Sequence, residues 1–117
     1  MATLENDSII GLELINSTTK ESTSIENDKQ IELIAKALAS KTRRRIMKLI
    51  HKEPMDVSMI ANSIINEDEK KPMTEANISA QIKTLEKAGL IECVYSSGQH
   101  GVRKISKLKY DRMEINF

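Results

Sequence analysis

The sequence contains one cysteine, no tryptophan and few aromatic residues of any kind. A single thiol cannot form an internal disulfide, and it excludes a zinc site built from several cysteines. Because aromatic residues make up only 3% of the 117 residues, we expect an aliphatic core and no stacking surface for single-stranded nucleic acid. Nothing in this composition requires an oxidising compartment, so we expect a cytoplasmic protein.

Long hydrophobic runs are also missing. No stretch approaches the roughly 18 uncharged apolar residues of a membrane helix, so we expect no membrane partner. The first residues, MATLENDSIIGLELIN, carry acids and no basic region, which is unlike a secretory signal.

Sequence patterns typical of catalysis are not present. The four glycines, at positions 11, 89, 98 and 101, form neither a P-loop nor a GxGxxG motif. No Ser/His/Asp set is suggested by spacing, so we expect no enzymatic activity and no cofactor.

Metal ligands are few. Cys93, His51 and His100 cannot form a tetrahedral zinc set within one chain, and we expect no metal, although a site shared between two subunits stays open. Cys93 is expected to be a buried strand residue, and it lacks the second cysteine that a redox switch uses.

Charge is unevenly distributed along the chain. Residues 1–28 carry six acidic residues and one lysine, whereas residues 29–117 carry 17 basic and 11 acidic residues. An acidic tail on a basic body is typical of a protein with a polyanionic partner, although ordinary solubility charge explains it equally well. We therefore expect an acidic, Ser/Thr/Asn-rich flexible N-terminal segment at 1–28, with a linker at 16–28, and a folded domain at 29–117. Residues 8–15 are apolar enough for a short strand or helix.

Periodicity in the body predicts four helices followed by strands. Apolar residues spaced at three and four predict helices at 29–40, from 41 to the residues before Pro54, at 58–65 and at 74–88. We expect N-caps at Asp28 and Ser58, Thr74 opening the last helix, and Gly89 as the C-cap of that helix. The segments 90–96 and 102–108 then predict a hairpin around a glycine-bounded turn, and 110–117 predicts a third strand or an extended arm.

Short helices followed by a hairpin are the order of a winged helix-turn-helix: mostly α, with a small antiparallel β-wing. In the helix from Thr74, the Ile78, Ile82 and Leu85 stripe faces the core, which leaves a polar side suited to the major groove of double-stranded DNA. An ordinary solvated helix face is the alternative. The candidate recognition residues are Thr74, Ala76, Asn77, Ser79, Ala80, Gln81, Lys83, Thr84 and Lys87.

The predicted hairpin adds cations directly after the candidate recognition helix. Its tip is small and polar, so it can lie along the minor groove and contact the phosphate backbone; a solvated hairpin with lysines on its edge is the alternative. The candidate wing contacts are Ser97, Gln99, His100, Arg103 and Lys104, and Arg43, Arg44 and Arg45 are candidate phosphate contacts.

Residues 32–112 resemble the arsenic-repressor-like (ArsR) winged-helix regulators. The resemblance rests on AKALASKTRRRIMKLI (35–50), DVSMIANSI (56–64) and NISAQIKTLEKAGLIE (77–92), and the C-terminal KISKLKYDRMEINF is similar to an archaeal branch. It implies a DNA-binding dimer that regulates transcription, often as a repressor. The sequence departs from the family pattern in two places. The turn at 66–77 is about twice the usual length, which leaves the position of the recognition helix open; the loop could contact DNA through Lys70 and Lys71 or be an insertion. Ala76 and Ala80 replace polar residues, which weakens base reading and favours recognition of shape or backbone.

Two apolar sets predict a homodimer. Leu33, Ala37 and Ala39 lie off the core face of the first body helix, and Met113, Ile115 and Phe117 alternate near the C-terminus. Each set could be core or part of a two-fold interface. A protein-binding winged helix without DNA binding is the alternative function, and the sequence identifies neither an operator nor a small-molecule effector.

Overall fold

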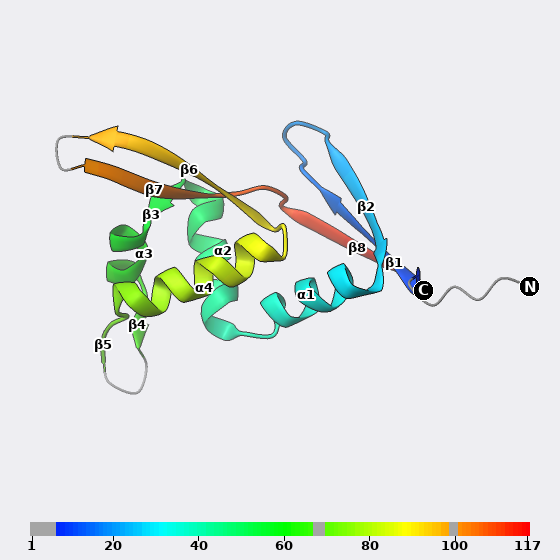
Figure 1. The fold of residues 1–117 in the computed structure, drawn as a ribbon, viewed down its shortest axis with the longest axis horizontal. Coiled ribbons are helices and arrows are strands. Elements are labelled where there is room, and N and C mark those ends of the chain that lie inside the picture. The colour runs from blue at the N-terminus through cyan, green and yellow to red at the C-terminus, as the bar shows by residue number, and fades with distance from the viewer. Residues whose placement is uncertain (1–6, 67–69, 99–100) are drawn as a thin grey trace, which may run out of the picture.

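A computed structural model describes residues 7–66, 70–98 and 101–117. Four helices form its centre (Figure 1): α1 (Asp28–Leu38), α2 (Lys41–Lys52), α3 (Val57–Ser63) and α4 (Glu75–Lys87). All four were predicted from periodicity, and the predicted start of α4 is confirmed because the Thr74 hydroxyl accepts the Asn77 N–H at 3.1 Å. The caps of α1 and α3 lie one or two residues earlier than predicted, at Asn27 and Asp56.

In the part of the chain that the structure describes, eight strands form three small antiparallel sheets. Their bounds are β1 (Asp7–Ile15), β2 (Ser22–Asn27), β3 (Met55–Asp56), β4 (Ile65–Asn66), β5 (Lys71–Pro72), β6 (Ile91–Gly98), β7 (Gly101–Leu108) and β8 (Arg112–Asn116). The sheets have the orders β2-β1-β8, β3-β7-β6 and β4-β5. The expectation of a mostly α protein is not confirmed, since strands and helices occupy similar shares of the described residues.

The flexible linker predicted at 16–28 is also wrong. Most of it forms the turn and second strand of a hairpin, in which Leu12 lies opposite Ile25 and Leu14 opposite Thr23. The turn is closed by Asn16, whose side-chain oxygen accepts the N–H groups of Thr18 and Thr19 at 3.0 Å. Asn forms such local turns readily, and the β-branched Thr favours strands, so a segment with few large apolar residues is ordered here.

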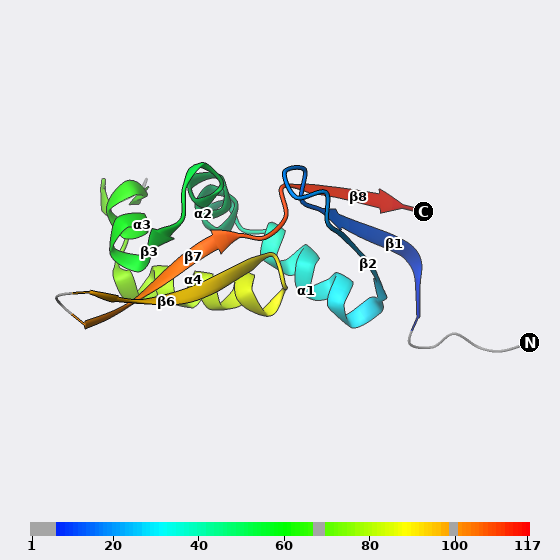
Figure 2. The ribbon, with the colours of Figure 1, turned by 90° about the horizontal axis from the view of Figure 1, so that it is seen from above.

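The N-terminal hairpin and the C-terminal strand form one sheet, although they lie at opposite ends of the sequence. Strand β8 pairs with β1, with Met113 opposite Leu14 and Ile115 opposite Leu12. This confirms the third strand predicted at 110–117. Figure 2 shows the sheet beside α1, with β8 on the side away from that helix.

The core is aliphatic, as predicted. Leu12 and Leu14 of β1 belong to the same buried cluster as residues from all four helices, so the N-terminal strands are part of the folded unit. The best-buried large side chains include Ile34, Ile46, Ile60, Ile78, Ile82 and Leu85. Burial of such side chains is worth about 1.5–3 kcal/mol each.

The long turn between α3 and α4 contains the small β4–β5 hairpin. Ile65 pairs with Pro72 and Asn66 with Lys71, and the Met73 N–H donates to the Ile64 carbonyl at 3.0 Å. The extra residues of this turn therefore lie between the two helices, and α4 still begins after Thr74, which is its N-cap.

Candidate nucleic-acid interface

Helix α4 has one buried face and one exposed face. Ile78, Ile82 and Leu85 are completely buried, as the predicted stripe requires. The opposite side is exposed at Thr74, Ala76, Ser79, Ala80, Lys83 and Lys87, whereas Asn77, Gln81 and Thr84 are half-buried. The exposed side chains are small except for the two lysines, so a partner can approach the helix backbone closely.

The flank of α4 that includes Asn77 and Gln81 is engaged inside the protein. The Gln81 amide donates to the Asn77 side-chain oxygen at 2.9 Å and accepts a hydrogen bond from Arg43 Nη1 at 2.7 Å. A ligand that used Gln81 would have to replace these bonds. The face available without rearrangement therefore comprises Ala76, Ser79, Ala80, Lys83 and Lys87.

Arg43, predicted as a phosphate contact, instead joins three helices. Its guanidinium donates to the Ala37 carbonyl at 2.9 Å and to the Lys36 carbonyl at 2.7 Å, in addition to Gln81. These carbonyls end α1, where a helix lacks internal donors. Arg44 donates to the Leu38 carbonyl at the same helix end, at 2.7 Å. Arg43 and Arg44 thus stabilise the junction of α1 and α2.

The third predicted arginine also contacts the protein. Arg45 is half-buried, and its Nη1 donates to the carbonyl of Ile65 in β4, at 3.4 Å. None of these three contacts indicates a phosphate site, and a role for these arginines in DNA binding stays a prediction.

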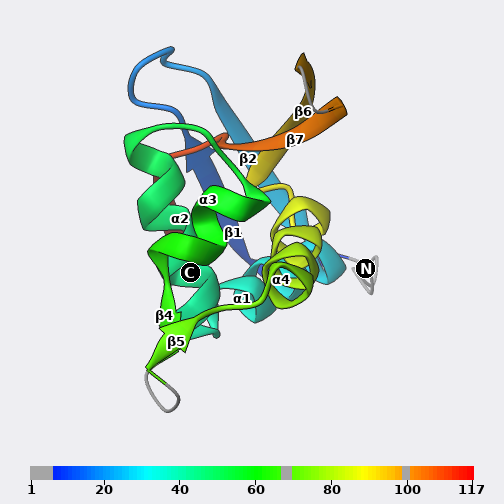
Figure 3. The same ribbon diagram turned by 90° about the vertical axis from the view of Figure 1, so that its left-hand side faces the viewer.

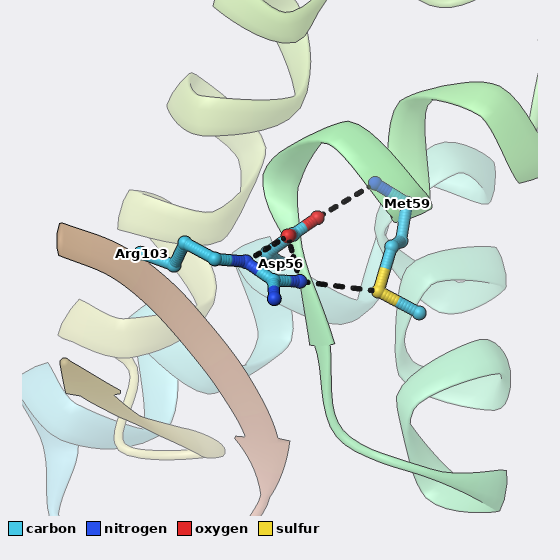
Figure 4. Close-up of polar contacts among 3 residues, drawn as sticks. All are labelled: Asp56, Met59 and Arg103. Atoms are coloured by element: carbon cyan, nitrogen blue, oxygen red, sulfur yellow. Dashed lines mark hydrogen bonds and ion pairs between the residues drawn. The ribbon is translucent and has the colours of Figure 1, made fainter. Parts of the chain in front are cut away.

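Strands β6 and β7 form a hairpin that projects past the helices (Figure 1). Arg103 of β7 ties this hairpin to α3 (Figure 4). Its Nε donates to the Asp56 carboxylate at 2.7 Å, and its Nη2 lies within contact distance of the same carboxylate oxygen. The Asp56 carboxylate also accepts the Met59 N–H at 2.8 Å as the cap of α3. The hydrogen bond from the Met59 N–H is the largest cause that holds the pKa of Asp56 below its usual value. The contacts with Arg103 lower this pKa further, whereas partial burial opposes them.

Lys104, the next residue, ties the hairpin to α4. Its ammonium lies 3.3 Å from the Glu86 carboxylate. Burial alone would lower the pKa of Lys104, but the hydrogen bond to Glu86 and the neighbouring charges raise it. Sequence reasoning missed Asp56 and Glu86, which lie 47 and 18 positions from their partners, because nothing local marks such pairs.

The exposed face of α4 and the projecting hairpin lie on one side of the molecule. Figure 3 shows α4 and the outer ends of β6 and β7 together, with α2 on the opposite side. Ser97 near the tip is exposed. The predicted contacts Gln99 and His100 lie outside the described residues.

The described residues show no competing site for metal chemistry. Within 7–66, 70–98 and 101–117, no three His, Cys, Asp or Glu side chains are grouped as metal ligands. Cys93 is half-buried on β6, and burial raises the pKa of its thiol, which keeps it protonated.

A pocket of about 360 Å³ between α2 and β8 has mostly apolar walls, including Leu14, Met47 and Met113. None of the four described helices is both long and apolar enough to cross a membrane.

Comparison with known proteins bears on this arrangement. Residues 38–94, just under half of the chain, match a family model described as a helix-turn-helix domain. The matched segment runs from the end of α1 through α4 into β6, so it includes the candidate recognition helix. No curated protein matches the chain.

Solved structures with a similar fold include the following two. One is the solution structure of a homodimeric winged helix-turn-helix DNA-binding domain (fragment 1–100) from Mycobacterium bovis, described as a possible ArsR-family transcriptional regulator. It has 25% sequence identity and a TM-score of 0.54. This chain has a winged helix-turn-helix fold. The alignment covers 68% of this chain and 64% of the M. bovis chain.

The second similar structure is a crystal structure of an ArsR family transcriptional regulator, with 25% identity and a TM-score of 0.56 over 72% of this chain and 75% of that one. Within the winged helix-turn-helix fold, α3 and α4 are the two helices of the turn, and the β6–β7 hairpin is the wing. The resemblance stated from the sequence agrees with both neighbours.

Proposed function

We propose that this protein is a transcriptional regulator that binds double-stranded DNA as a homodimer, with α4 in the major groove and the β6–β7 wing against the neighbouring backbone. The observation that carries the proposal is that α4, whose outward side chains are exposed, lies on the same side of the molecule as the projecting wing (Figure 3). The helix-turn-helix match and the two similar structures support it. The function is binding, not catalysis.

The chemistry of the α4 face favours contact with DNA backbone and shape over extensive base reading. Ala76 and Ala80 offer no polar group, and Gln81 and Asn77 are bonded to each other. Ser79 and Lys83 are left as exposed polar groups in the middle of the helix. Small side chains permit close approach, and Lys83 and Lys87 neutralise phosphates, so sequence preference is expected to come largely from DNA deformability.

The test is a titration of fluorescent duplex DNA by anisotropy over a salt series. We expect duplex binding whose logarithm falls linearly with the logarithm of salt concentration. Lys83→Ala is expected to weaken binding and to reduce the slope by about one unit. Lys29→Ala, which removes an exposed lysine of α1 away from the interface, is the matched control and should leave the slope unchanged. Absence of duplex binding at low salt would refute the proposal.

One observation favours a second candidate, a protein-binding winged helix. The wing carries three exposed apolar side chains, Val94, Tyr95 and Val102, with exposed fractions of 51%, 70% and 69%. Exposed apolar groups are typical of protein contacts. This alternative predicts a stable protein partner in a pull-down, lost on substitution of Tyr95 by Ser, and no binding of duplex DNA.

Three finer points belong to the proposal. Repression is the proposed mode of regulation, since the ArsR resemblance implies it most often. The similarity of residues 104–117 to an archaeal branch supports a place in that branch, and a DNA-binding regulator of that kind would act in the cytoplasm. A reporter placed behind a bound promoter distinguishes repression from activation.

A further inference from the structure

Strand β8 lies at the edge of the β2-β1-β8 sheet. In the described part of the chain, it pairs with β1 on one side and with no strand on the other. Such an edge presents unpaired N–H and C=O groups to which another strand can add. Helix α1 contacts β1 and β2, and Figure 2 shows β8 on the side of the sheet away from it.

One face of β8 is apolar and becomes uncovered toward its C-terminal end, since Met113 packs against the core and the residues after it are exposed. Register places Met113 opposite Leu14 and Ile115 opposite Leu12, so these side chains point to the same face as the buried leucines. Alternation puts Phe117 on that face too. The leucines are only 3–4% exposed, whereas Ile115 is 51% and Phe117 99% exposed. We call Met113, Ile115 and Phe117 the β8 strip, and at Met113 it borders the apolar pocket beside α2.

The other apolar set weighed as a dimer surface offers much less. Ala37 of α1 is completely buried in the core of its own chain, and Ala39 is small. Leu33, 37% exposed, is the one large apolar side chain of that set at the surface. The strip on β8 therefore presents more apolar surface, and it adds a free backbone edge.

We propose that a second copy of this chain covers the β8 strip by pairing its own β8 antiparallel to this one, which extends the sheet to six strands across the two-fold axis. The inference rests on the homodimer of the proposed function and names its interface. A two-fold pairing of antiparallel strands sets one residue opposite its own copy. Within β8 the central candidates are Met113, Glu114 and Ile115.

Matching of apolar groups selects Ile115 as that residue. An axis at Glu114 would set two carboxylates against each other, which is destabilising. An axis at Met113 would pair Arg112 with Glu114, which have opposite charges. It would also set the exposed Ile115 opposite Asp111 and the exposed Phe117 opposite Lys109. With the axis at Ile115, Met113 faces Phe117 of the other copy, so apolar groups meet apolar groups. On the opposite face Glu114 then lies beside Asn116, and no like charges meet.

Disulfide trapping tests this register. In a Cys93→Ser background, Ile115→Cys places two thiols opposite each other, with Cα atoms about 4.5–5.5 Å apart, within the range for a disulfide. Glu114→Cys, the matched control, places its thiols two positions out of register and beyond about 7 Å, so no bridge forms. We expect a covalent dimer from Ile115→Cys alone under mild oxidation. Cross-linking of Glu114→Cys but not Ile115→Cys would overturn the register.

A second pair of variants tests the surface without thiol chemistry. Ile115→Lys places two ammonium groups opposite each other and should raise the dimer dissociation constant at least about tenfold in analytical ultracentrifugation. Leu33→Lys on α1 is the control and should leave it unchanged. Both positions are substantially exposed in the single chain, so both variants are expected to fold. Circular dichroism checks this.

The outcomes separate this inference from the proposed function. A dimer that is weakened by Leu33→Lys and not by Ile115→Lys would place the interface on α1 and overturn the inference while the homodimer stands. A wild-type chain that is monomeric at micromolar concentration and still binds duplex DNA would overturn both the β8 interface and the homodimer, but not DNA binding.

Discussion

Arg103 in the wing and Asp56 at the start of α3 form an ion pair that joins two elements 47 positions apart in sequence. The same carboxylate accepts the Met59 N–H as the cap of α3. One side chain therefore sets both the start of the first helix of the turn and the position of the wing strand β7 (Figure 4). Because the interface requires α4 and the wing on one side, Asp56 is a structural link in its assembly.

Substitution of Asp56 separates the cap from the ion pair. Asp56→Ala removes both and should lower the free energy of unfolding by about 1–2 kcal/mol, the usual cost of losing a helix cap plus a small ionic term. Asp56→Asn keeps an effective cap and should cost less. Arg103→Ala should cost under about 1 kcal/mol, since Arg103 is 53% exposed. Urea unfolding measures all three; a larger loss for Arg103→Ala than for Asp56→Ala would contradict this ranking.

Stability should also depend on pH through Asp56. Its pKa in the folded protein lies below the usual value, so its ionised form stabilises the fold. This contribution is complete above the unfolded pKa, near 3.9, and is lost as the pH falls through the folded pKa. The Asp111 carboxylate, whose pKa is lowered by the Ser17 N–H, acts in the same direction.

The comparison with Asp56→Asn isolates the Asp56 contribution. The difference in unfolding free energy between the wild type and this variant should be constant from pH 7 to about pH 5 and should shrink below about pH 4. Urea unfolding at a series of pH values measures it. If the difference in unfolding free energy grew as the pH fell, the ionised form of Asp56 would not be the form that stabilises the fold.

The sequence predicted the helical part of the fold because local signals there agree with the packing. Apolar spacing located α1 to α4, and Thr74 and Gly89 bound α4 as expected; Gly89 has a φ of +79°. The exposed face of α4 follows from the same periodicity. Ion pairs between residues far apart in the sequence could not be predicted in this way. The sequence therefore predicts Arg103 and Lys104 as DNA contacts but does not predict their ion pairs with Asp56 and Glu86.

The N-terminal hairpin was missed for a related reason. Composition indicated that residues 16–28 could not bury enough apolar surface to fold alone. In the structure, β2 of this segment pairs with β1. Strand β1 in turn pairs with β8, about 100 positions away, and packs Leu12 and Leu14 into the core. Long-range pairing of this kind has no signature in a local window.

Arg43 should contribute to stability more than to DNA binding. Arg43→Lys keeps the positive charge but cannot donate simultaneously to the Lys36 and Ala37 carbonyls and to Gln81. We expect a loss of about 1–3 kcal/mol in unfolding free energy, because charged hydrogen bonds at a partly buried helix end are removed. Lys48→Arg on the same helix is a control with no expected effect. An unchanged stability in Arg43→Lys, together with a salt slope of DNA binding that falls by about one unit in Arg43→Ala, would restore Arg43 as a phosphate contact.

The integration of the N-terminal strand can be tested at Leu14. This side chain is 3% exposed and lies in the common core, so Leu14→Ala should cost about 2–5 kcal/mol. The loss should appear in a single cooperative transition of the whole domain. Glu13→Ala, the neighbouring half-buried position whose side chain points to the other face, should change stability by less than about 1 kcal/mol. Equal, small effects would mean that the hairpin does not share the core.

The Arg103–Asp56 pair also predicts how the wing responds to salt. A protein cation that neutralises a DNA phosphate releases about 0.9 counterion from the DNA. The charge of Arg103 is already neutralised by Asp56. If Arg103 moved from Asp56 to a phosphate, the Asp56 carboxylate would bind a cation from solution, which would offset the released counterion. Arg103→Ala should therefore change the salt slope of duplex binding by much less than Lys83→Ala, which removes a lysine without an ion-pair partner in the described structure. Asp56→Asn frees Arg103 and should steepen the slope by about one unit. Anisotropy titrations at four salt concentrations measure these slopes, and equal slope losses for Arg103→Ala and Lys83→Ala would show that Arg103 leaves Asp56 without cost on binding DNA.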